Sequence, residues 1–194
     1  MNKPTFFTAD THFGHEAIRR HCHRPFETTE QMDQAIVDNW NGIVPCNGLV
    51  YVLGDFAWRD HRKYLARLNG SKILILGNHD AMSQLDLAQF AEVHQLLDRS
   101  FDKKQMTLCH YKMQTYRNSF HGAWHLFGHS HGRLCGGALS FDIGVDVWDY
   151  RPVPFEVVRK KMLAKAAMVR GKNFDGEAEE VIKREKEVNK QWSV

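Results

Sequence analysis

The sequence predicts an α/β protein, and three observations support this prediction. Several short, continuous apolar runs have the length and composition of buried β-strands. Segments in which apolar residues recur at helical spacing lie between some of these runs and after the last of them. The composition, 43% hydrophobic and 25% charged over 194 residues, is ordinary for a globular domain. We therefore expect one domain over residues 1–171, followed by a charged helical extension over residues 172–194.

Five apolar runs are expected to form the main strands. Each of them stops at a polar residue or a glycine, which is typical of a buried strand that ends in a loop. A further segment, residues 139–147, alternates enough for a strand pair or a bend, with Gly144 as a candidate bulge. The five runs cover residues 4–9, 49–53, 72–76, 105–109 and 124–127.

Helices are expected between and after these strands. Thr28 and Gln31 have the spacing of a capping box, which predicts a helix over residues 29–41. The segment between residues 10 and 26 is rich in His and Arg and is expected to be a loop. Further helices are predicted over residues 60–68, over residues 85–90, and from residue 154 to Gly171.

Charge and hydropathy exclude several classes of protein. The net charge of +3 is too small to indicate nucleic-acid binding by itself. No apolar run is long enough to span a membrane and no secretory signal is visible, so we expect a cytoplasmic protein with no membrane partner. A homo-oligomer is left open.

The unusual feature of the composition is the 12 histidines, because His is the commonest neutral metal ligand.

Potential metal ligands follow each of the five expected strands. Taken singly, each has an ordinary explanation: Asp55 could cap a helix, Asn78 could occupy a turn, and His110 could be a half-buried histidine. The carboxyl ends of strands in an open α/β sheet lie along one edge, so the loops that follow them are expected to meet there. Their joint occurrence therefore favours a metal site. The candidates are Asp10, His12, Asp55, Asn78, His79, His110, His129 and His131.

The residue types in this set indicate which cations it would bind. Without His79, the set contains two carboxylates, one amide and four imidazoles. That mixture suits Zn, Mn or Fe(II), whereas Ca and Mg prefer oxygen ligands and Cu(I) prefers sulfur. Seven side chains are too many for one tetrahedral site and suit two cations that share a bridging carboxylate. A purely structural zinc domain is disfavoured because such sites are rich in cysteine.

The order of these residues resembles a known family. D-T-H at residues 10–12, G-D at 54–55, G-N-H-D at 77–80, H at 110 and G-H-S-H at 128–131 are similar to the motifs of calcineurin-like metallophosphoesterases. The opening T-A-D-T-H-F-G-H and the later R-P-F resemble the small bacterial and phage-type branch of that family. The resemblance implies an α/β sandwich of two mixed β-sheets flanked by helices, to which the C-terminal helical segment is appended.

The resemblance also implies a pair of divalent cations, with Mn favoured and Fe, Ni or Zn as alternatives. Asp55 would be the ligand that bridges the two cations. The first cation would be bound by Asp10, His12, Asp55 and His131. The second would be bound by Asp55, Asn78, His110 and His129.

Four further residues have roles implied by the resemblance. His79 matches a histidine that contacts the phosphate and assists the leaving group, and Asp80 matches its acidic partner. His15 and Arg24 belong to motifs of the branch and are expected to bind the substrate. Lys112 departs from the pattern, since related sequences often carry proline there, and this puts the shape or charge of the substrate loop in doubt.

The implied activity is hydrolysis of a phosphate ester by a metal-bridging hydroxide, which needs no protein nucleophile. We expect a phosphodiesterase that acts on nucleotides or nucleic-acid ends. A phosphomonoesterase is the near alternative, since both reactions use the same cation pair, and a non-catalytic scaffold of the same fold is less favoured because His79 is retained. Four aromatic residues near the motif loops could stack on a base or could pack in the core or rim: Trp58, Tyr111, Tyr116 and Trp124.

Overall fold

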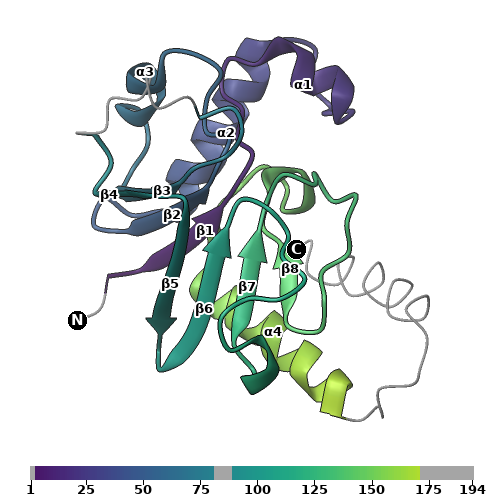
Figure 1. Ribbon diagram of the computed structural model, residues 1–194. Helices are drawn as coiled ribbons and strands as arrows, with labels where there is room; N and C mark the ends of the chain where they lie inside the picture. The colour runs from purple at the N-terminus through teal and green to yellow at the C-terminus, as the bar shows by residue number, and fades with distance from the viewer. Residues whose placement is uncertain (1–2, 81–88, 171–194) are drawn as a thin grey trace.

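The computed structural model describes residues 3–80 and 89–170. Its strands form two mixed β-sheets that pack face to face, with helices on the outside (Figure 1). The predicted α/β sandwich is therefore confirmed. No helix of the described residues is long and apolar enough to cross a membrane.

The first sheet has the strand order β4-β3-β2-β1-β9. Four of its strands are parallel, and β9 pairs antiparallel with β1 at one edge. Because β1, β2 and β3 run side by side in the same direction, the loops that follow them leave from one edge of the sheet. The strands are β1 (Thr5–Thr8), β2 (Leu49–Leu53), β3 (Ser71–Ile75), β4 (Glu92–His94) and β9 (Val153–Pro154).

The second sheet has the strand order β5-β6-β7-β8. A hairpin joins β5 (Leu96–Phe101) to β6 (Lys104–Cys109), and β7 (Trp124–Phe127) and β8 (Ser140–Asp142) then follow parallel to β6. The loops after β6 and β7 therefore also leave from a common edge. This edge and the corresponding edge of the first sheet meet at the candidate site.

Alternate residues of the strands build the core between the sheets. Phe7 and Tyr51 from the first sheet stack with ring centroids 5.3 Å apart, and Leu108 and Leu126 from the second sheet belong to the same buried cluster. The period-two alternation of a strand directs the intervening residues to the opposite face. Both faces of the first sheet are thus buried, which explains its continuous apolar runs.

Helix α2 (Thr29–Ile43) covers the outer face of the first sheet. Its residues Ile36 and Trp40 are fully buried in one cluster with Val50 and Val52 of β2. The predicted cap is present in part: the Thr28 side chain accepts a hydrogen bond from the backbone N–H of Gln31, but the Gln31 side chain accepts from the backbone N–H of Glu27 instead of that of Thr28.

The other helices are α1 (Glu16–His21), α3 (His61–Leu65) and α4 (Phe155–Arg170). Figure 1 shows α1, α2 and α3 grouped beside the first sheet and α4 passing behind the second, and α4 contacts β9 and β1 of the first sheet. Helix α4 packs into the core between the sheets through Val158 and Met162, which are both fully buried. The helix predicted from residue 154 to Gly171 is therefore confirmed over the part of the chain that the structure describes.

Several local predictions differ from the structure. The segment expected to be a loop contains α1, which was missed because only Ile18 of this helix is buried. Strands β4 and β5 were also missed, since both carry exposed or half-buried polar residues rather than an apolar run. Residues 139–147 contain β8 and a 3₁₀ turn at Val145–Val147, and Gly144 forms an isolated parallel bridge with Ala9 instead of a bulge.

Two predictions lie outside the described residues. Most of the short helix expected at residues 85–90 falls on residues 81–88, and the charged extension falls on residues 172–194. The division of the chain at residue 171 therefore stays a prediction.

Candidate metal centre

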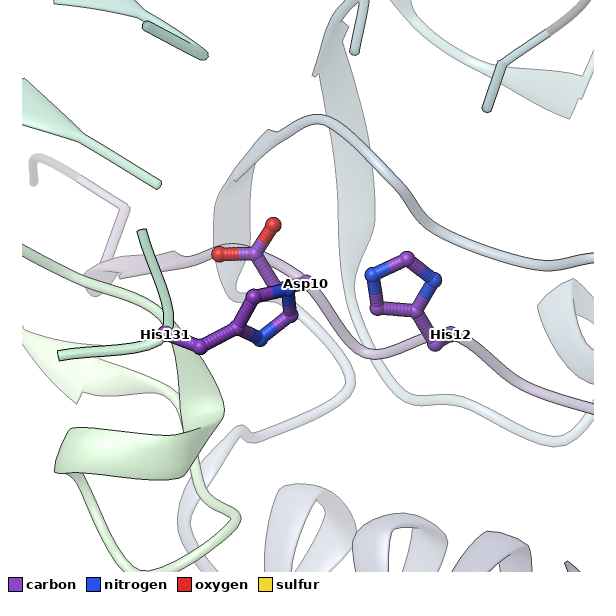
Figure 2. A group of neighbouring side chains, drawn as sticks. All are labelled: Asp10, His12 and His131. Carbon is purple, nitrogen blue, oxygen red and sulfur yellow. The ribbon is translucent and has the colours of Figure 1, made fainter. Parts of the chain in front are cut away.

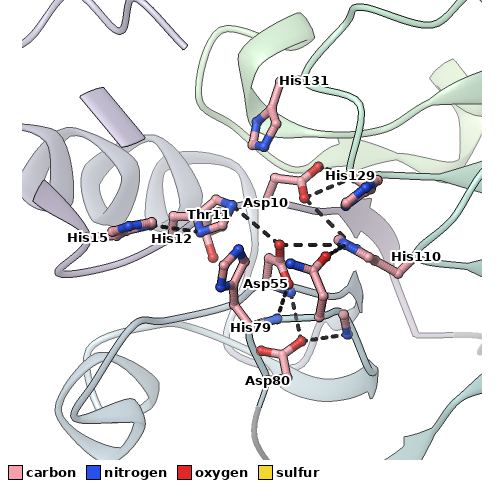
Figure 3. A network of polar contacts seen from close by, with 12 residues as sticks. Asp10, Thr11, His12, His15, Asp55, His79, Asp80, His110, His129 and His131 are labelled. Carbon is pink, nitrogen blue, oxygen red and sulfur yellow. Dashed lines mark hydrogen bonds and ion pairs between the residues drawn. The ribbon is translucent and has the colours of Figure 1, made fainter. Parts of the chain in front are cut away.

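The candidate site lies where the carboxyl ends of parallel strands from both sheets meet. The loops after β1, β2 and β3 contribute from one side, and the loops after β6 and β7 contribute from the other (Figure 3). The structure brings all seven candidate ligands together in these loops: Asp10, His12, Asp55, Asn78, His110, His129 and His131.

Asp55 occupies the middle of this cluster. Its Oδ2 lies 3.5 Å from Nε2 of His12 on one side and 3.5 Å from Nε2 of His110 on the other. Its Oδ1 accepts a hydrogen bond of 2.9 Å from the backbone N–H of His79. One carboxylate oxygen thus faces imidazoles from both sheets, which is the arrangement needed for a bridging ligand.

Asp10, His12 and His131 form the first donor group (Figure 2). Their ligand atoms all lie within 4.8 Å of one another. The Asp10 carboxylate is held in place by the backbone N–H of His129, at 3.1 Å from Oδ1 and 2.9 Å from Oδ2. These three residues are the ones that the sequence assigned, with Asp55, to the first cation.

Asp55, His110 and His129 form the second donor group, again with ligand atoms within 4.8 Å of one another. Asn78 joins this group, because its Oδ1 lies 3.1 Å from Nε2 of His110. The other ring nitrogen of His110, Nδ1, lies 2.7 Å from the carbonyl oxygen of Leu53. A hydrogen bond to that carbonyl fixes the tautomer and leaves Nε2 as the ligand nitrogen.

The burial of these groups fits the binding of divalent cations. His12 Nε2 is buried and has no hydrogen-bond partner. Burial and the nearby Arg24 charge lower the pKa of His12 well below its usual value, so the imidazole is neutral, as a metal ligand must be. Burial raises the pKa of Asp10 well above its usual value. A cation beside Asp10 would compensate the cost of keeping this carboxylate ionised.

The backbone of the ligand loops is unusual. Five of the candidate ligands have φ between 47° and 65°, in the left-handed region that residues other than glycine rarely adopt. Backbone of this kind costs about 1–3 kcal/mol per residue and clusters at functional sites. Hydrogen bonds between the ligand loops stabilise this backbone conformation. One of them runs from the backbone N–H of His12 to the carbonyl oxygen of Asp55 at 2.9 Å. The five are Asp10, His12, Asp55, His129 and His131.

Arg24, which was expected to bind the substrate, is bonded to other groups of the protein. Its side chain is fully buried, and its Nε and Nη2 donate hydrogen bonds of 2.8 Å to the two carboxylate oxygens of Asp146. It also donates to the carbonyl oxygens of Asp10 and Thr11. These hydrogen bonds connect Arg24 to the loop after β1 and to Asp146, and its expected role in substrate binding stays a prediction.

Asp146 connects Arg24 to the ligand His131. Its Oδ2 lies 2.7 Å from Nδ1 of His131. Burial opposes protonation of His131, but its hydrogen bonds to Asp146 and Cys22 and the charge of Asp10 raise its pKa to about 10. Although burial also opposes ionisation of Asp146, the hydrogen bond from His131 and the charge of Arg24 hold the pKa of that carboxyl below its usual value.

Asp80 is bonded to the backbone of the site. Its Oδ2 accepts from the backbone N–H groups of Asp55, at 2.7 Å, and Gly77, at 2.8 Å, and its Oδ1 accepts from that of Phe56, at 3.0 Å. Burial raises the pKa of Asp80 in spite of these hydrogen bonds. The geometry fits a residue that positions the loops after β2 and β3.

His79 and His15 lie on the side of the first donor group. The ring centroids of His79 and His12 are 5.4 Å apart, and those of His79 and His15 are 5.9 Å apart. His15 Nδ1 lies 3.3 Å from Nδ1 of His12, and the His15 ring stacks on Trp58 with centroids 4.2 Å apart. Burial and the neighbouring His79 lower the pKa of His15.

Glycines permit the close packing of the ligand loops. A Cβ atom at Gly77 would collide with the Asp55 carboxylate, and one at Gly54 would collide with the His110 ring. A Cβ at Gly144 would lie 2.7 Å from the carboxylate of Asp10. Glycine is therefore required at these positions for the ligand loops to pack this closely.

Comparison with known proteins supports the fold. The solved structure of the protein of unknown function AQ665 from Aquifex aeolicus has a TM-score of 0.67 and 25% identity, and it covers 82% of this chain and 100% of that one. A second structure, the phosphoesterase YfcE from E. coli, has a TM-score of 0.39 and 15% identity, covering 72% of this chain and 77% of that one. The first of these similarities agrees with the two-sheet α/β architecture.

Sequence comparison finds two relatives of unstated activity, and no protein-family model matches the chain. The uncharacterized protein MJ1445 of Methanocaldococcus jannaschii is 29% identical over 177 residues, covering 85% of this chain and 94% of its own. The Gene 66 protein of Mycobacterium phage L5 is 30% identical over 82 residues, which is 39% of each chain.

The sequence analysis missed two residues of the site, Asp146 and Cys22. Within residues 3–80 and 89–170, they form a third group with His131 whose possible ligand atoms lie within 4.8 Å of one another. Asp146 lies in a 3₁₀ turn after β8 and far in sequence from every motif. Cys22 directly follows α1, and no spacing pattern relates it to His131.

Proposed function

We propose that this protein is a metal-dependent phosphoesterase, and that it hydrolyses phosphodiesters of nucleotides or nucleic acids. The observation that carries the proposal is the position of Asp55, whose Oδ2 lies 3.5 Å from imidazole nitrogens of both His12 and His110. A carboxylate shared between two donor groups is suited to a pair of divalent cations. The motifs that contain these residues, which resemble those of calcineurin-like metallophosphoesterases, support the same activity.

The protein's contribution is to position ligands and substrate. When bound, two divalent cations lower the pKa of a water molecule and neutralise the charge of the phosphate ester. The hydrogen bonds at Nδ1 of His110 and Nδ1 of His131 orient these rings and leave Nε2 of each as the nitrogen that would bind a cation. We favour Mn, with Fe, Ni and Zn as alternatives, because the donors are a mixture of carboxylate, amide and imidazole.

His79 is assigned the role of an acid or hydrogen-bond donor to the ester. Its backbone N–H donates to Oδ1 of Asp55 at 2.9 Å, so the His79 backbone is held beside that carboxylate. From this place, a protonated imidazole can donate to the oxygen of the leaving group or to the charged oxygens of the phosphate. Asp80 is assigned a positioning role, since its carboxylate accepts from the backbone N–H groups of Asp55 and Gly77 and so connects the loops after β2 and β3.

The surroundings of Arg24 and His15, the two residues expected to bind the substrate, favour a diester over a monoester. A phosphate monoester carries more negative charge than a diester, and free arginine or lysine side chains are well suited to bind it. Arg24, the buried arginine of the site, is already bonded to Asp146. His15 has a lowered pKa and stacks on Trp58. Neither residue supplies a free positive charge for a monoester.

The proposal is tested by hydrolysis of bis-p-nitrophenyl phosphate beside p-nitrophenyl phosphate. Protein stripped of metal with a chelator is resupplied with Mn, Ni, Fe(II), Zn or Mg, and bound metal is measured by mass spectrometry. Asp55→Asn is the control, because it removes the bridging charge while preserving the shape of the side chain.

The outcomes separate the candidate activities. Metal-dependent cleavage of the diester that is lost in Asp55→Asn supports a phosphodiesterase. A preference for the monoester would instead indicate a phosphatase. A protein that binds two cations but hydrolyses neither ester, nor any cyclic nucleotide, RNA or DNA, would be a scaffold, and a protein that binds no cation would overturn the proposal altogether.

A further inference from the structure

Two exposed aromatic side chains flank the candidate metal centre. Trp58 is 39% exposed, and its ring centroid lies 5.3 Å from that of His79. Tyr111 is 46% exposed, and its ring centroid lies 5.0 Å from that of His129. Large aromatic side chains normally bury most of their surface, so exposure beside a candidate ligand cluster suggests a ligand that covers them.

The two rings lie at opposite ends of the cluster. Trp58 stacks on His15 with an interplanar angle of 9°, and Tyr111 packs edge-on against His110 with centroids 4.9 Å apart. Figure 3 shows His15 at one end of the cluster and His110 and His129 at the other, with the Asp55 carboxylate between them. A phosphate held beside Asp55 would therefore have one aromatic surface on each side.

A backbone hydrogen bond positions Trp58, and the fixed ring of the preceding residue, His110, marks the position of Tyr111. The backbone N–H of Trp58 donates to the carbonyl oxygen of Phe13 at 2.9 Å, next to the β-bridge between Phe13 and Ala57. Tyr111 follows directly after His110, whose ring is held by the carbonyl oxygen of Leu53. The rings are thus placed by the same loops that carry the candidate ligands.

The other two aromatic candidates from the sequence are already used by the protein. Trp124 is only 3% exposed and lies in the core between the sheets. The Tyr116 hydroxyl lies within hydrogen-bond distance of the carbonyl oxygens of Ala123 and Leu139. Of the four aromatic residues considered, Trp58 and Tyr111 are the pair available to a substrate.

We propose that Trp58 and Tyr111 stack on the two planar groups that flank the phosphorus of a phosphodiester substrate. Trp58 lies beside His79 and receives the leaving group, and Tyr111 lies beside His129 and receives the group that stays on the phosphate. A diester has two organic substituents, and a nucleotide base stacks on an aromatic side chain whatever its identity. This inference rests on the proposed phosphodiesterase function and specifies its substrate as one with a planar group on both sides.

The test compares two substrates that release the same p-nitrophenolate. Thymidine 5′-(p-nitrophenyl phosphate) has a planar group on each side, whereas methyl p-nitrophenyl phosphate has one only on the leaving side. The expected effect of Tyr111→Leu is a loss of about ten-fold in kcat/KM for the thymidine ester, with the methyl ester unaffected. The expected effect of Trp58→Leu is a loss of similar size for both esters, so that their ratio is preserved.

Matched variants separate stacking from general disturbance. Tyr111→Phe and Trp58→Phe keep an aromatic face and are expected to retain most of kcat/KM. Phe120→Leu alters an 87% exposed aromatic residue in the loop between β6 and β7. It is expected to leave kcat/KM unchanged for both substrates. Calorimetric binding of thymidine 5′-monophosphate supplies a readout without turnover, and it should weaken in Tyr111→Leu alone.

The inference is overturned if Tyr111→Leu leaves both the substrate ratio and the binding of thymidine 5′-monophosphate unchanged, or if Trp58→Leu alters the ratio instead. Both of these results are compatible with metal-dependent hydrolysis by the wild-type protein, so the proposed function would survive them. If the wild-type protein hydrolyses neither ester with any of the five cations, the proposed function fails, and the inference fails with it.

Discussion

Asp146 determines which nitrogen of His131 faces the candidate metal centre. The Asp146 carboxylate lies 2.7 Å from Nδ1 of His131, and a hydrogen bond at Nδ1 leaves Nε2 as the nitrogen available to a cation. The same carboxylate is bound by the buried guanidinium of Arg24, which also donates to the carbonyl oxygen of Asp10 at 2.7 Å. Arg24 and Asp146 thereby connect the first ligand loop to the last.

The Asp146→Asn variant is expected to weaken binding of the first cation. The amide removes the charge that orients His131 and replaces one acceptor for Arg24 with a donor. Loss of such a partner lowers metal affinity by about 10- to 100-fold. Calorimetric titration of the metal-stripped protein with Mn measures this effect. Asp149→Asn alters an exposed acid three residues away and should not change the titration.

The Gly77→Ala variant is expected to disrupt the bridging carboxylate. A Cβ at this position would collide with the Asp55 side chain and would lie 2.7 Å from the Asp55 backbone nitrogen. Asp55 must then move away from both donor groups, so we expect loss of bound metal and of metal-dependent hydrolysis. Metal content per chain, measured by mass spectrometry after dialysis, checks this outcome.

Gly42→Ala supplies the matched control for that substitution. Gly42 lies in helix α2, and a Cβ there would meet no atom within 4 Å. Because alanine is a better helix former than glycine, this variant should be more stable by about 0.5–1 kcal/mol and should bind metal normally. A Gly77→Ala protein with the same metal content as Gly42→Ala would show that the loops after β2 and β3 can separate without loss of the site.

The strands and the clustering of the candidate ligands could be predicted because their signals are local. The apolar runs at Leu49–Leu53 and Trp124–Phe127 coincide with the observed β2 and β7, since both strands are buried on both faces. Each candidate ligand lies within a few residues of the end of such a run, so the common edge at which the strands end was enough to predict that the loops meet. Strand β5 gave no such signal, because it lies at the edge of its sheet with polar and exposed residues.

The ion pair of Arg24 could not be predicted, because it depends on a contact between distant segments. Arg24 and Asp146 are 122 residues apart in the chain. An arginine beside a histidine-rich motif is equally compatible with substrate binding and with a buried ion pair. The choice between them depends on whether an acid from elsewhere reaches the guanidinium, and Asp146 lies in a turn that belongs to no motif.

The buried Lys72 predicts how stability depends on pH. Burial lowers the pKa of Lys72 from 10.5 to about 8. Below pH 8 the folded protein bears the cost of a buried charge, and this cost decreases from pH 8 to pH 10.5 because the amine loses its proton more readily in the folded state. The unfolding free energy of the wild-type protein should therefore rise, relative to that of Lys72→Met, over this range.

Urea denaturation of the two metal-stripped proteins at pH 7 and pH 10 measures the difference. Lys72→Met also removes the hydrogen bonds that the amine donates to the carbonyl oxygens of Leu65 and Leu68. That loss shifts the curve of the variant at every pH, whereas the charge effect changes with pH. If the difference in unfolding free energy between the two proteins were the same at pH 7 and pH 10, the lowered pKa of Lys72 would be contradicted.

The His79→Ala variant tests the assignment of a leaving-group acid. We expect turnover of a dinucleotide diester to fall by about 10²- to 10⁴-fold, because its alkoxide leaving group needs a proton. Both cations should be retained, since Asp10, His12, Asp55 and the other ligands are unchanged. Rates at saturating substrate, together with metal content per chain, measure the two effects separately.

The same variant should affect p-nitrophenyl esters far less. The p-nitrophenolate ion is a stable anion and departs without a proton, so removal of an acid costs little for this substrate. If His79 instead acted on the charged oxygens of the phosphate, its loss would slow both substrates equally, because those oxygens are the same in each. Equal losses would therefore indicate that His79 acts on the phosphate oxygens and not on the leaving group. No loss with either substrate would show that His79 takes no part in the reaction.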